Sequence, residues 1–183
     1  TAEFMSKWGS YGSTDGQFTG PQKVAIDSSG NLYVTDYNGI QKFTNDGTFI
    51  RKWGSPCNLQ TGAGCIDPDG TGPLGGPLSL GDGQFYFPTG IGVNSASNVF
   101  VIDKANQRIQ EFMSNGTFIR KWGSLCNLQN GTGCIDPDGA GPLSRGDGQF
   151  NYPALGYYSG PIGIATDSSG SVIIADTGND RIQ

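Results

Sequence analysis

Short apolar segments alternate with polar turns along the whole chain. Segments such as 23–27 and 32–36 are separated by turns rich in Ser, Asn and Gly, whereas the runs of Ala, Glu, Lys and Leu that favour helices are absent. Glycine accounts for 31 of the 183 residues, more than twice the usual share of about 7%. The glycines recur in fixed contexts and so mark turns. The pattern predicts an all-β fold of short strands.

The segments return in the same order three times. A Gly-Gln-Phe sequence precedes a first strand at 23–27, 90–94 and 163–167, and a second strand at 32–36, 99–103 and 172–176. Third strands lie at 40–43 and 108–112 and begin at 181, and fourth strands lie at 48–53 and 117–122. The turns at 45–47 and 114–116 contain Asp-Gly and Asn-Gly, which are strong hairpin signals. Four hairpin-joined strands form an up-and-down sheet, and such sheets arranged radially form a β-propeller.

The third repeat carries the most specific motif. Residues 161–167 read Pro-Ile-Gly-Ile-Ala-Thr-Asp, and residues 175–183 read Ala-Asp-Thr-Gly-Asn-Asp-Arg-Ile-Gln. This pattern resembles the NHL repeat, and the resemblance extends over nearly the whole chain apart from two inserts. The resemblance implies a propeller of four-stranded antiparallel blades whose face loops contact proteins, glycans or RNA.

The repeat divides the chain into six parts: 1–15, an outer strand of a neighbouring blade with its connector; 16–55, a blade; 56–82, an insert; 83–124, a blade; 125–147, an insert; and 148–183, an incomplete blade. Residues 3–10 align with 48–55, so they read as a lone fourth strand. About three blades cannot close a ring, since propellers have four to eight. We expect either a window on a longer chain, which the stop inside a third strand favours, or half of a six-bladed ring.

Each insert contains one pair of cysteines, Cys57 with Cys65 and Cys126 with Cys134. A disulfide within each insert is the economical expectation, and it would place the protein outside the cell or at its surface. A zinc site shared by the four cysteines and free thiols are the alternatives, but zinc sites usually have closer cysteine spacing.

Carboxylates and two sequons are further candidates in and around the inserts. Hard oxygen ligands for calcium would come from two matching sets: Asp67, Asp69 and Asp82, and Asp136, Asp138 and Asp147. The alternative is plain turn chemistry, because Asp-Pro and Asp-Gly start turns unaided. Asn115 and Asn130 each begin an Asn-Gly-Thr glycosylation sequon.

An Asp ends each second strand and an Arg opens the next strand in two of the repeats. We expect these residues to form structural brackets, Asp103 with Arg108 and Asp176 with Arg181. The first repeat has Gly39 where the arginine belongs, so its bracket should be absent. The recurring Phe and Trp residues are expected in packing between blades.

Net charge and residue chemistry limit the classes of function that we expect for the chain. A net charge of −5 argues against nucleic acid as a partner, and no apolar run approaches the roughly 18 residues of a membrane span. Propeller lactonases and related enzymes depend on histidine and metal, whereas this sequence has no histidine. We expect an extracellular, non-enzymatic scaffold for protein or glycan binding, adhesion or self-association. The alternative is a lactonase-like hydrolase whose catalytic residues lie in blades outside this sequence.

Overall fold

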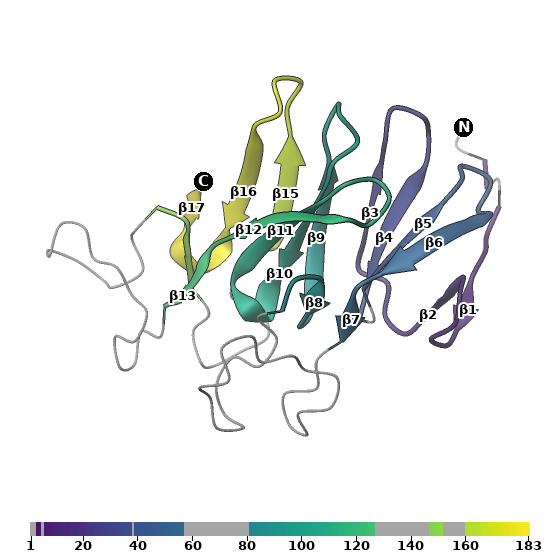
Figure 1. The fold of residues 1–183 in the computed structure, drawn as a ribbon, viewed down its shortest axis with the longest axis horizontal. Helices are drawn as coiled ribbons and strands as arrows, with labels where there is room; N and C mark the ends of the chain where they lie inside the picture. Colours follow the sequence, from purple (N-terminus) through teal and green to yellow (C-terminus); the bar gives the residue numbers. More distant parts are fainter. Residues whose placement is uncertain (1–2, 5, 38, 57–80, 127–146, 152–159) are drawn as a thin grey trace, which may run out of the picture.

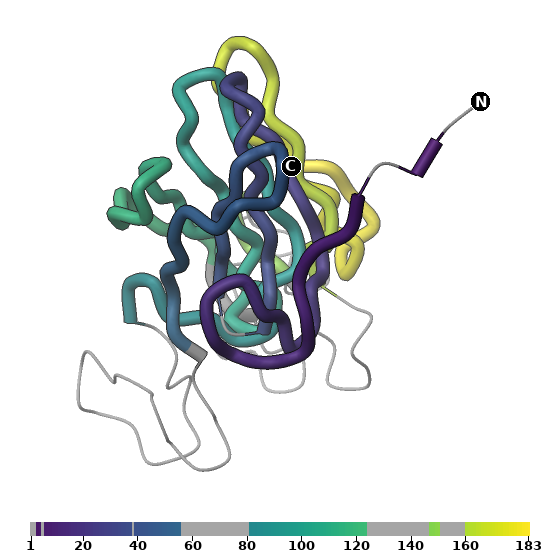
Figure 2. Tube along the Cα trace, turned by 90° about the vertical axis from the view of Figure 1, so that its right-hand side faces the viewer, coloured from purple at the N-terminus to yellow at the C-terminus, as the bar shows by residue number. Residues whose placement is uncertain are grey.

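The computed structural model describes residues 3–4, 6–37, 39–56, 81–126, 147–151 and 160–183, in a fold made of β-strands and two short 3₁₀ turns. Three antiparallel sheets stand side by side (Figure 1). Seen at right angles, they lie one behind another (Figure 2). This is the arrangement of successive β-propeller blades, as the repeat predicts.

The first blade contains four strands in chain order: β3 (Lys23–Ile26), β4 (Leu32–Asp36), β5 (Gly39–Phe43) and β6 (Phe49–Trp53). Val24 pairs with Val34, and Ile40 pairs with both Thr35 and Trp53. The strands are short because Asp and Gly turns interrupt them at close intervals.

The second blade repeats this order with β9 (Pro88–Val93), β10 (Val99–Asp103), β11 (Arg108–Phe112) and β12 (Phe118–Trp122). The turn η1 (Lys104–Asn106) joins β10 to β11, and Gln107 ends it in a left-handed conformation. The third blade contains β15 (Gly163–Thr166), β16 (Val172–Asp176), the turn η2 (Thr177–Asn179) and β17 (Arg181–Ile182).

Apolar side chains fill the two layers between the blades. Between the first and second blades, Tyr33 and Ile40 pack with Val101 and Phe112. Between the second and third, Phe100 and the neighbouring side chains of β10 and β11 pack with Ile174. Aromatic residues contribute to both layers, as the sequence predicts; Trp53, for example, lies 6.2 Å from Phe112 between ring centroids. Burial of these side chains is the main source of blade-to-blade stability.

Equivalent positions on the outer faces of the row are exposed. Ile91 of the second blade is 6% exposed, whereas its first-blade equivalent Val24 is 59% exposed. Ile109 is fully buried, whereas its third-blade equivalent Ile182 is 69% exposed. The same repeat residues are therefore buried only where a neighbouring blade covers them.

The lone fourth strand expected at residues 3–10 differs in detail. Residues 6–9 form no strand, since none of the described strands lies beside them as a ladder partner. Trp8 nevertheless packs on Phe43 with 6.4 Å between ring centroids, much as Trp53 packs on Phe112. The side chain thus takes the repeat position although the backbone ladder is absent.

Candidate functional site

Three short parallel strand pairs lead into the blades, and we call them the stems. The first joins β1 (Ser10–Tyr11) to β2 (Gln17–Phe18). The second joins β7 (Ser55–Pro56) to β8 (Gln84–Phe85), and the third joins β13 (Ser124–Cys126) to β14 (Gln149–Asn151). They lie toward the lower side of the view in Figure 1. Each stem is the link between the outer strand of one blade and the inner strand of the next.

The stems share a tight contact between glycine and phenylalanine. Gly54 has φ +96°, and a Cβ atom there would lie 2.6 Å from Cε2 of Phe85. Any side chain at Gly54 would be strained and would displace the buried ring. Gly123 has the same relation to Phe150, at 2.8 Å. This contact explains why Trp-Gly and Gln-Phe recur together in the sequence.

The parallel pairing of a stem is the same whether the segment between its two strands is short or long. In the first stem, Gly12 and Ser13 occupy the place that residues 57–80 take in the second. Ser55 N donates to Gly83 O at 3.1 Å and so fastens the two ends of the second stem together. An insert therefore leaves the blade and returns to it at one point.

A glutamine on the third strand clamps each stem to its blade. In the second blade, Gln110 Nε2 donates to Gln84 O at 2.7 Å, and Gln110 Oε1 accepts from Gly83 N at 3.0 Å. Gln41 makes the same two bonds to the first stem, and Gln183 makes them to the third. Because one planar amide satisfies a carbonyl and an N–H together, the clamp fixes stem position without charge.

An ion pair reinforces the clamp in the second blade. Arg108 Nε lies 2.7 Å from Asp103 Oδ2, and both side chains are buried. Arg108 Nη2 donates to Gln84 O at 2.8 Å and to Gly81 O at 3.1 Å. Asp103 also accepts from Tyr86 N and from the Asn106 side chain. Burial raises the pKa of Asp103, and the Arg108 charge opposes that rise.

The third blade repeats this network with one more exposed partner. Arg181 Nε lies 3.1 Å from Asp176 Oδ2, and Arg181 Nη2 donates to Gln149 O at 2.9 Å. The Arg181 side chain is 25% exposed, whereas the Asp176 side chain is fully buried. Asn179 donates to Asp176 as Asn106 does to Asp103. The structure thus brings together both Asp–Arg pairs that the sequence nominates.

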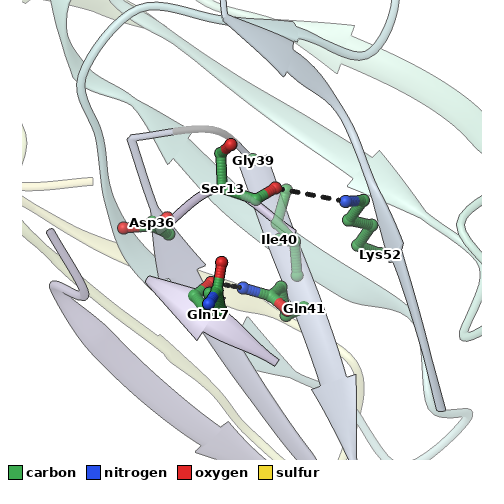
Figure 3. A pocket seen from close by; sticks show the side chains of 7 residues that line it. All are labelled: Ser13, Gln17, Asp36, Gly39, Ile40, Gln41 and Lys52. Carbon is green, nitrogen blue, oxygen red and sulfur yellow. Dashed lines mark hydrogen bonds between the residues drawn. The ribbon is translucent and has the colours of Figure 1, made fainter. Parts of the chain in front are cut away.

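The first blade lacks the arginine and has a small hollow at this corner (Figure 3). Its volume is about 10 Å³, roughly the space of one water molecule. The lining residues come from the first stem and from β4 to β6: Ser13, Gln17, Asp36, Gly39, Ile40, Gln41 and Lys52. Asp36 accepts from Thr19 N and Gly20 N, the positions equivalent to Tyr86 and Phe87.

The opposite end of the first blade carries a second polar feature. Asp27 accepts hydrogen bonds from Ser29, Asn31 and the Tyr33 hydroxyl. Burial raises the pKa of Asp27, but these donors outweigh it and hold that pKa below its usual value. Burial and the Asp27 charge raise the pKa of Tyr33. The second blade has Asn94 and Phe100 at these positions. The third blade has Asp167, which also accepts from its turn, but Ile173 in place of the tyrosine, so only the tyrosine contact is particular to the first blade.

Comparison with known proteins identifies the repeat. A family model described as NHL repeat matches residues 18–39 and 158–183. The chain contains NHL repeats. The sequence is also 26% identical over 125 residues to Protein brain tumor of Drosophila melanogaster, a match that covers 66% of this chain and 10% of that protein.

Solved structures resemble this chain in fold. A protein of unknown function from Bacteroides thetaiotaomicron superposes with a TM-score of 0.55 and 19% identity, over 94% of this chain and 36% of that one. Virginiamycin B lyase from Staphylococcus aureus gives a TM-score of 0.46 at 17% identity, over 90% of this chain and 37% of that one. The NHL chain therefore spans little more than a third of these structures.

Several residues nominated by the NHL sequence lie outside the described part of the chain: Cys57, Cys65, Cys134, Asp67, Asp69, Asp136, Asp138 and Asn130. The backbone of Cys126 lies in β13, but its side chain is not described. The disulfide and calcium hypotheses therefore stay predictions. Among the described residues, no three His, Cys, Asp or Glu side chains gather as metal ligands, and no described helix has the length and hydropathy to span a membrane.

Three further candidate residues, Asp82, Asp147 and Asn115, lie on the surface of the blades. Asp82 pairs with Lys121 at 2.9 Å, and both side chains are partly exposed. The equivalent Asp15 pairs with Lys52 at 2.9 Å, so this contact belongs to the repeat. Asp147 is exposed. Asn115 is exposed in the hairpin between β11 and β12, where its side chain accepts from Thr117 N.

Sequence reasoning missed the glutamine clamp. Gln41, Gln110 and Gln183 end the same short motif in all three repeats, so the signal was present. A neutral side chain on a predicted strand gives no reason to expect it to bind a backbone segment about 26 residues earlier in the chain. The only sequence signal for the hollow beside Gln41 was Gly39 at the position of the arginine.

Proposed function

We propose that this chain is part of an extracellular NHL-propeller scaffold that binds protein or glycan partners, or copies of itself, at a cell surface. The observation that carries the proposal is the stem. Two successive blades hold an insert at the same point with the same parallel pairing. The blades thus present two nearly identical segments at one repeat interval.

Repetition of the inserts supports assembly over recognition of a small molecule. Residues 57–70 and 126–139 are nearly the same sequence. A ligand pocket needs different groups converging on one point, whereas equal segments at equal spacing suit a partner that is itself repeated. Two linked contacts of moderate affinity also gain strength through their high effective concentration.

The charged residues at the blade corners support a binding role without catalysis. Asp103, Arg108 and Asp176 are buried and hold stem backbone or one another. These groups are committed to structure, and the 183 residues contain no histidine to serve as a general base. The described corners therefore supply no acid–base pair directed at a substrate.

An extracellular location is supported by the cysteine pattern. Each insert has its own pair of cysteines eight positions apart. A disulfide within each insert would restrict its conformations and reduce the entropy lost on binding. Alkylation of the unreduced protein followed by intact-mass measurement should find no free thiol.

Replacement of the inserts tests the scaffold role. Residues 57–80, residues 126–145, or both, are exchanged for the Gly-Ser pair that occupies this place in the first stem. Sedimentation velocity measures self-association, and a glycan array measures carbohydrate binding. We expect each single replacement to weaken association or glycan binding and the double replacement to abolish it.

Thermal unfolding is the control for this experiment. Two paired residues of each stem and all the glutamine clamps remain in every replacement, although exchange of residues 126–145 removes the Cys126–Asn151 pair of the third stem. The midpoint should therefore stay near that of the parent chain. Association and glycan binding that survive the double replacement at full strength would contradict the proposed function.

A further inference from the structure

The hollow of the first blade occupies the place of an arginine side chain. Asp36 pairs with Gly39 across β4 and β5, in the register in which Asp103 pairs with Arg108 across β10 and β11. The third blade has Arg181 opposite Asp176. One corner in three therefore has the frame of an arginine site and no arginine from its own strand.

The acceptors that hold the guanidinium in the second blade have first-blade equivalents. Arg108 contacts Asp103, Gln84 O and Gly81 O. The matching groups are Asp36, Gln17 O and Thr14 O. Gln84 O accepts from both Arg108 and Gln110, whereas Gln17 O accepts from the Gln41 side chain alone among the described side chains. The first corner therefore retains acceptor capacity at a carbonyl that serves an arginine elsewhere.

Asp36 is a buried carboxylate without a cation beside it. It is 2% exposed, and among the described residues no Lys or Arg lies within ion-pair distance of it. Thr19 and Gly20 donate hydrogen bonds to it, which stabilises the charge without neutralising it. Buried carboxylates are usually paired with a cation, as Asp103 and Asp176 are.

Among the residues that the structure describes, no nearby side chain of the chain fills the hollow. Gly39 has φ +125°, and a Cβ atom there would lie 2.3 Å from Trp53 O, so an arginine cannot be accommodated at that position. Lys52 lines the hollow, but its Nζ atom lies 2.9 Å from Asp15 and donates to Ser13 O at 3.3 Å (Figure 3). Neither Gly39 nor Lys52 therefore supplies a cation to Asp36.

We propose that this corner is a binding site for a guanidinium group, supplied by an arginine side chain of a partner protein. A planar guanidinium matches a carboxylate together with two carbonyls, whereas an ammonium does not. The hollow of about 10 Å³ is smaller than a guanidinium group, so binding requires it to widen by outward movement of Ser13 and Lys52, which lie on its exposed side. Lys121 pairs with Asp82 at the equivalent place beside Arg108, so a lysine there is compatible with a guanidinium. The inference is independent of the scaffold role.

NMR titration of the whole chain tests the site, with the side-chain amide of Gln41 and the backbone amide of Gly16 as reporters. The probes are guanidinium chloride, methylammonium chloride and sodium chloride at equal ionic strength. We expect saturable shifts with guanidinium alone and a dissociation constant in roughly the millimolar range, because so small an ion gains few contacts. Asp36→Asn should weaken binding at least about tenfold, while Asp46→Asn, an exposed turn acid of the same blade, should leave it unchanged.

Arg181→Ala provides a positive control because it empties a true arginine site. In that variant guanidinium should also shift the Gln183 side chain and the Gly148 amide. A shift at Gln183 without one at Gln41 would overturn the proposal, and so would the absence of a shift at both residues. Equal shifts with methylammonium would overturn it too, since they would indicate general attraction of cations.

Two capped tripeptides distinguish the sources of the guanidinium group. Acetyl-Gly-Arg-Gly-amide should shift Gln41 and Gly16, and acetyl-Gly-Lys-Gly-amide should not. Binding of the free ion with no binding of the arginine peptide would contradict an arginine partner and restrict the site to small guanidino compounds.

Discussion

The first and second blades place the same stem against the same corner with different chemistry. In the second blade, Arg108 and Gln110 both donate to Gln84 O, and Arg108 is paired with Asp103 across a 3₁₀ turn. In the first blade, Gly39 replaces the arginine, and Gln41 is the one described side chain that donates to the equivalent carbonyl, Gln17 O, beside a hollow. All three blades bind their stem through the glutamine, whereas the arginine adds further contacts in only two of them.

The largest effect should follow removal of the buried arginine. Arg108→Ala leaves Asp103 buried without its cation and removes one donor from each of two stem carbonyls, so we expect a loss of about 3–5 kcal/mol of unfolding free energy. Urea denaturation measures it. Arg108→Lys should restore only part of the loss, because an ammonium cannot make the forked contacts. A loss below about 1 kcal/mol in Arg108→Ala would show that the arginine network does not stabilise the second blade relative to the first.

Removal of the clamp should show the next largest effect. Gln110→Ala leaves the Gly83 N–H without its acceptor and should cost about 1–3 kcal/mol. Gln41→Ala should cost less, because Gln110 also donates to Asp103 at 3.2 Å and is fully buried. Guanidinium would occupy the hollow, so urea is the suitable denaturant. Equal losses in the two variants would show that the arginine network does not strengthen the second clamp.

Acid should affect the first blade through Asp27. Its pKa in the folded state lies below that of the unfolded chain, so the unfolded chain binds the proton more readily at acid pH. The stabilisation is present above the unfolded pKa and is lost as the pH falls through the folded pKa. Asp27→Asn, which copies Asn94 of the second blade, should flatten this part of the melting-temperature profile below about pH 4. If the melting temperature of the variant falls with pH as steeply as that of the parent chain, groups other than Asp27 cause the acid sensitivity.

The smallest effect belongs to the exposed pair between Lys121 and Asp82. Lys121→Ala should cost about 0.2–1 kcal/mol at low salt and almost nothing in 1 M sodium chloride. Lys52→Ala tests the equivalent pair with Asp15. A salt-independent loss above about 2 kcal/mol in either variant would show that these pairs contribute more than surface ion pairs do.

Most of the fold was readable from sequence because the repeat displays each local signal several times. Asp-Gly and Asn-Gly turns fix the hairpins, and one Asp and one Arg at constant spacing nominate the corner pairs. The parallel stems were not predicted, since pairing of two residues at each end of an insert leaves no periodic pattern. The hollow depends on how closely Gly39 approaches Trp53, which is a matter of three-dimensional packing.

Native-state hydrogen exchange at two equivalent amides tests most directly whether the arginine reinforces a common clamp. Gly16 N and Gly83 N donate to glutamine oxygens at 2.9 and 3.0 Å, so bond length does not distinguish them. We expect exchange at least about tenfold slower at Gly83 than at Gly16, corresponding to roughly 1.4 kcal/mol from the arginine network. Arg108→Ala should remove that difference. Equal protection of the two amides in the parent chain, or a difference that survives Arg108→Ala, would contradict this expectation.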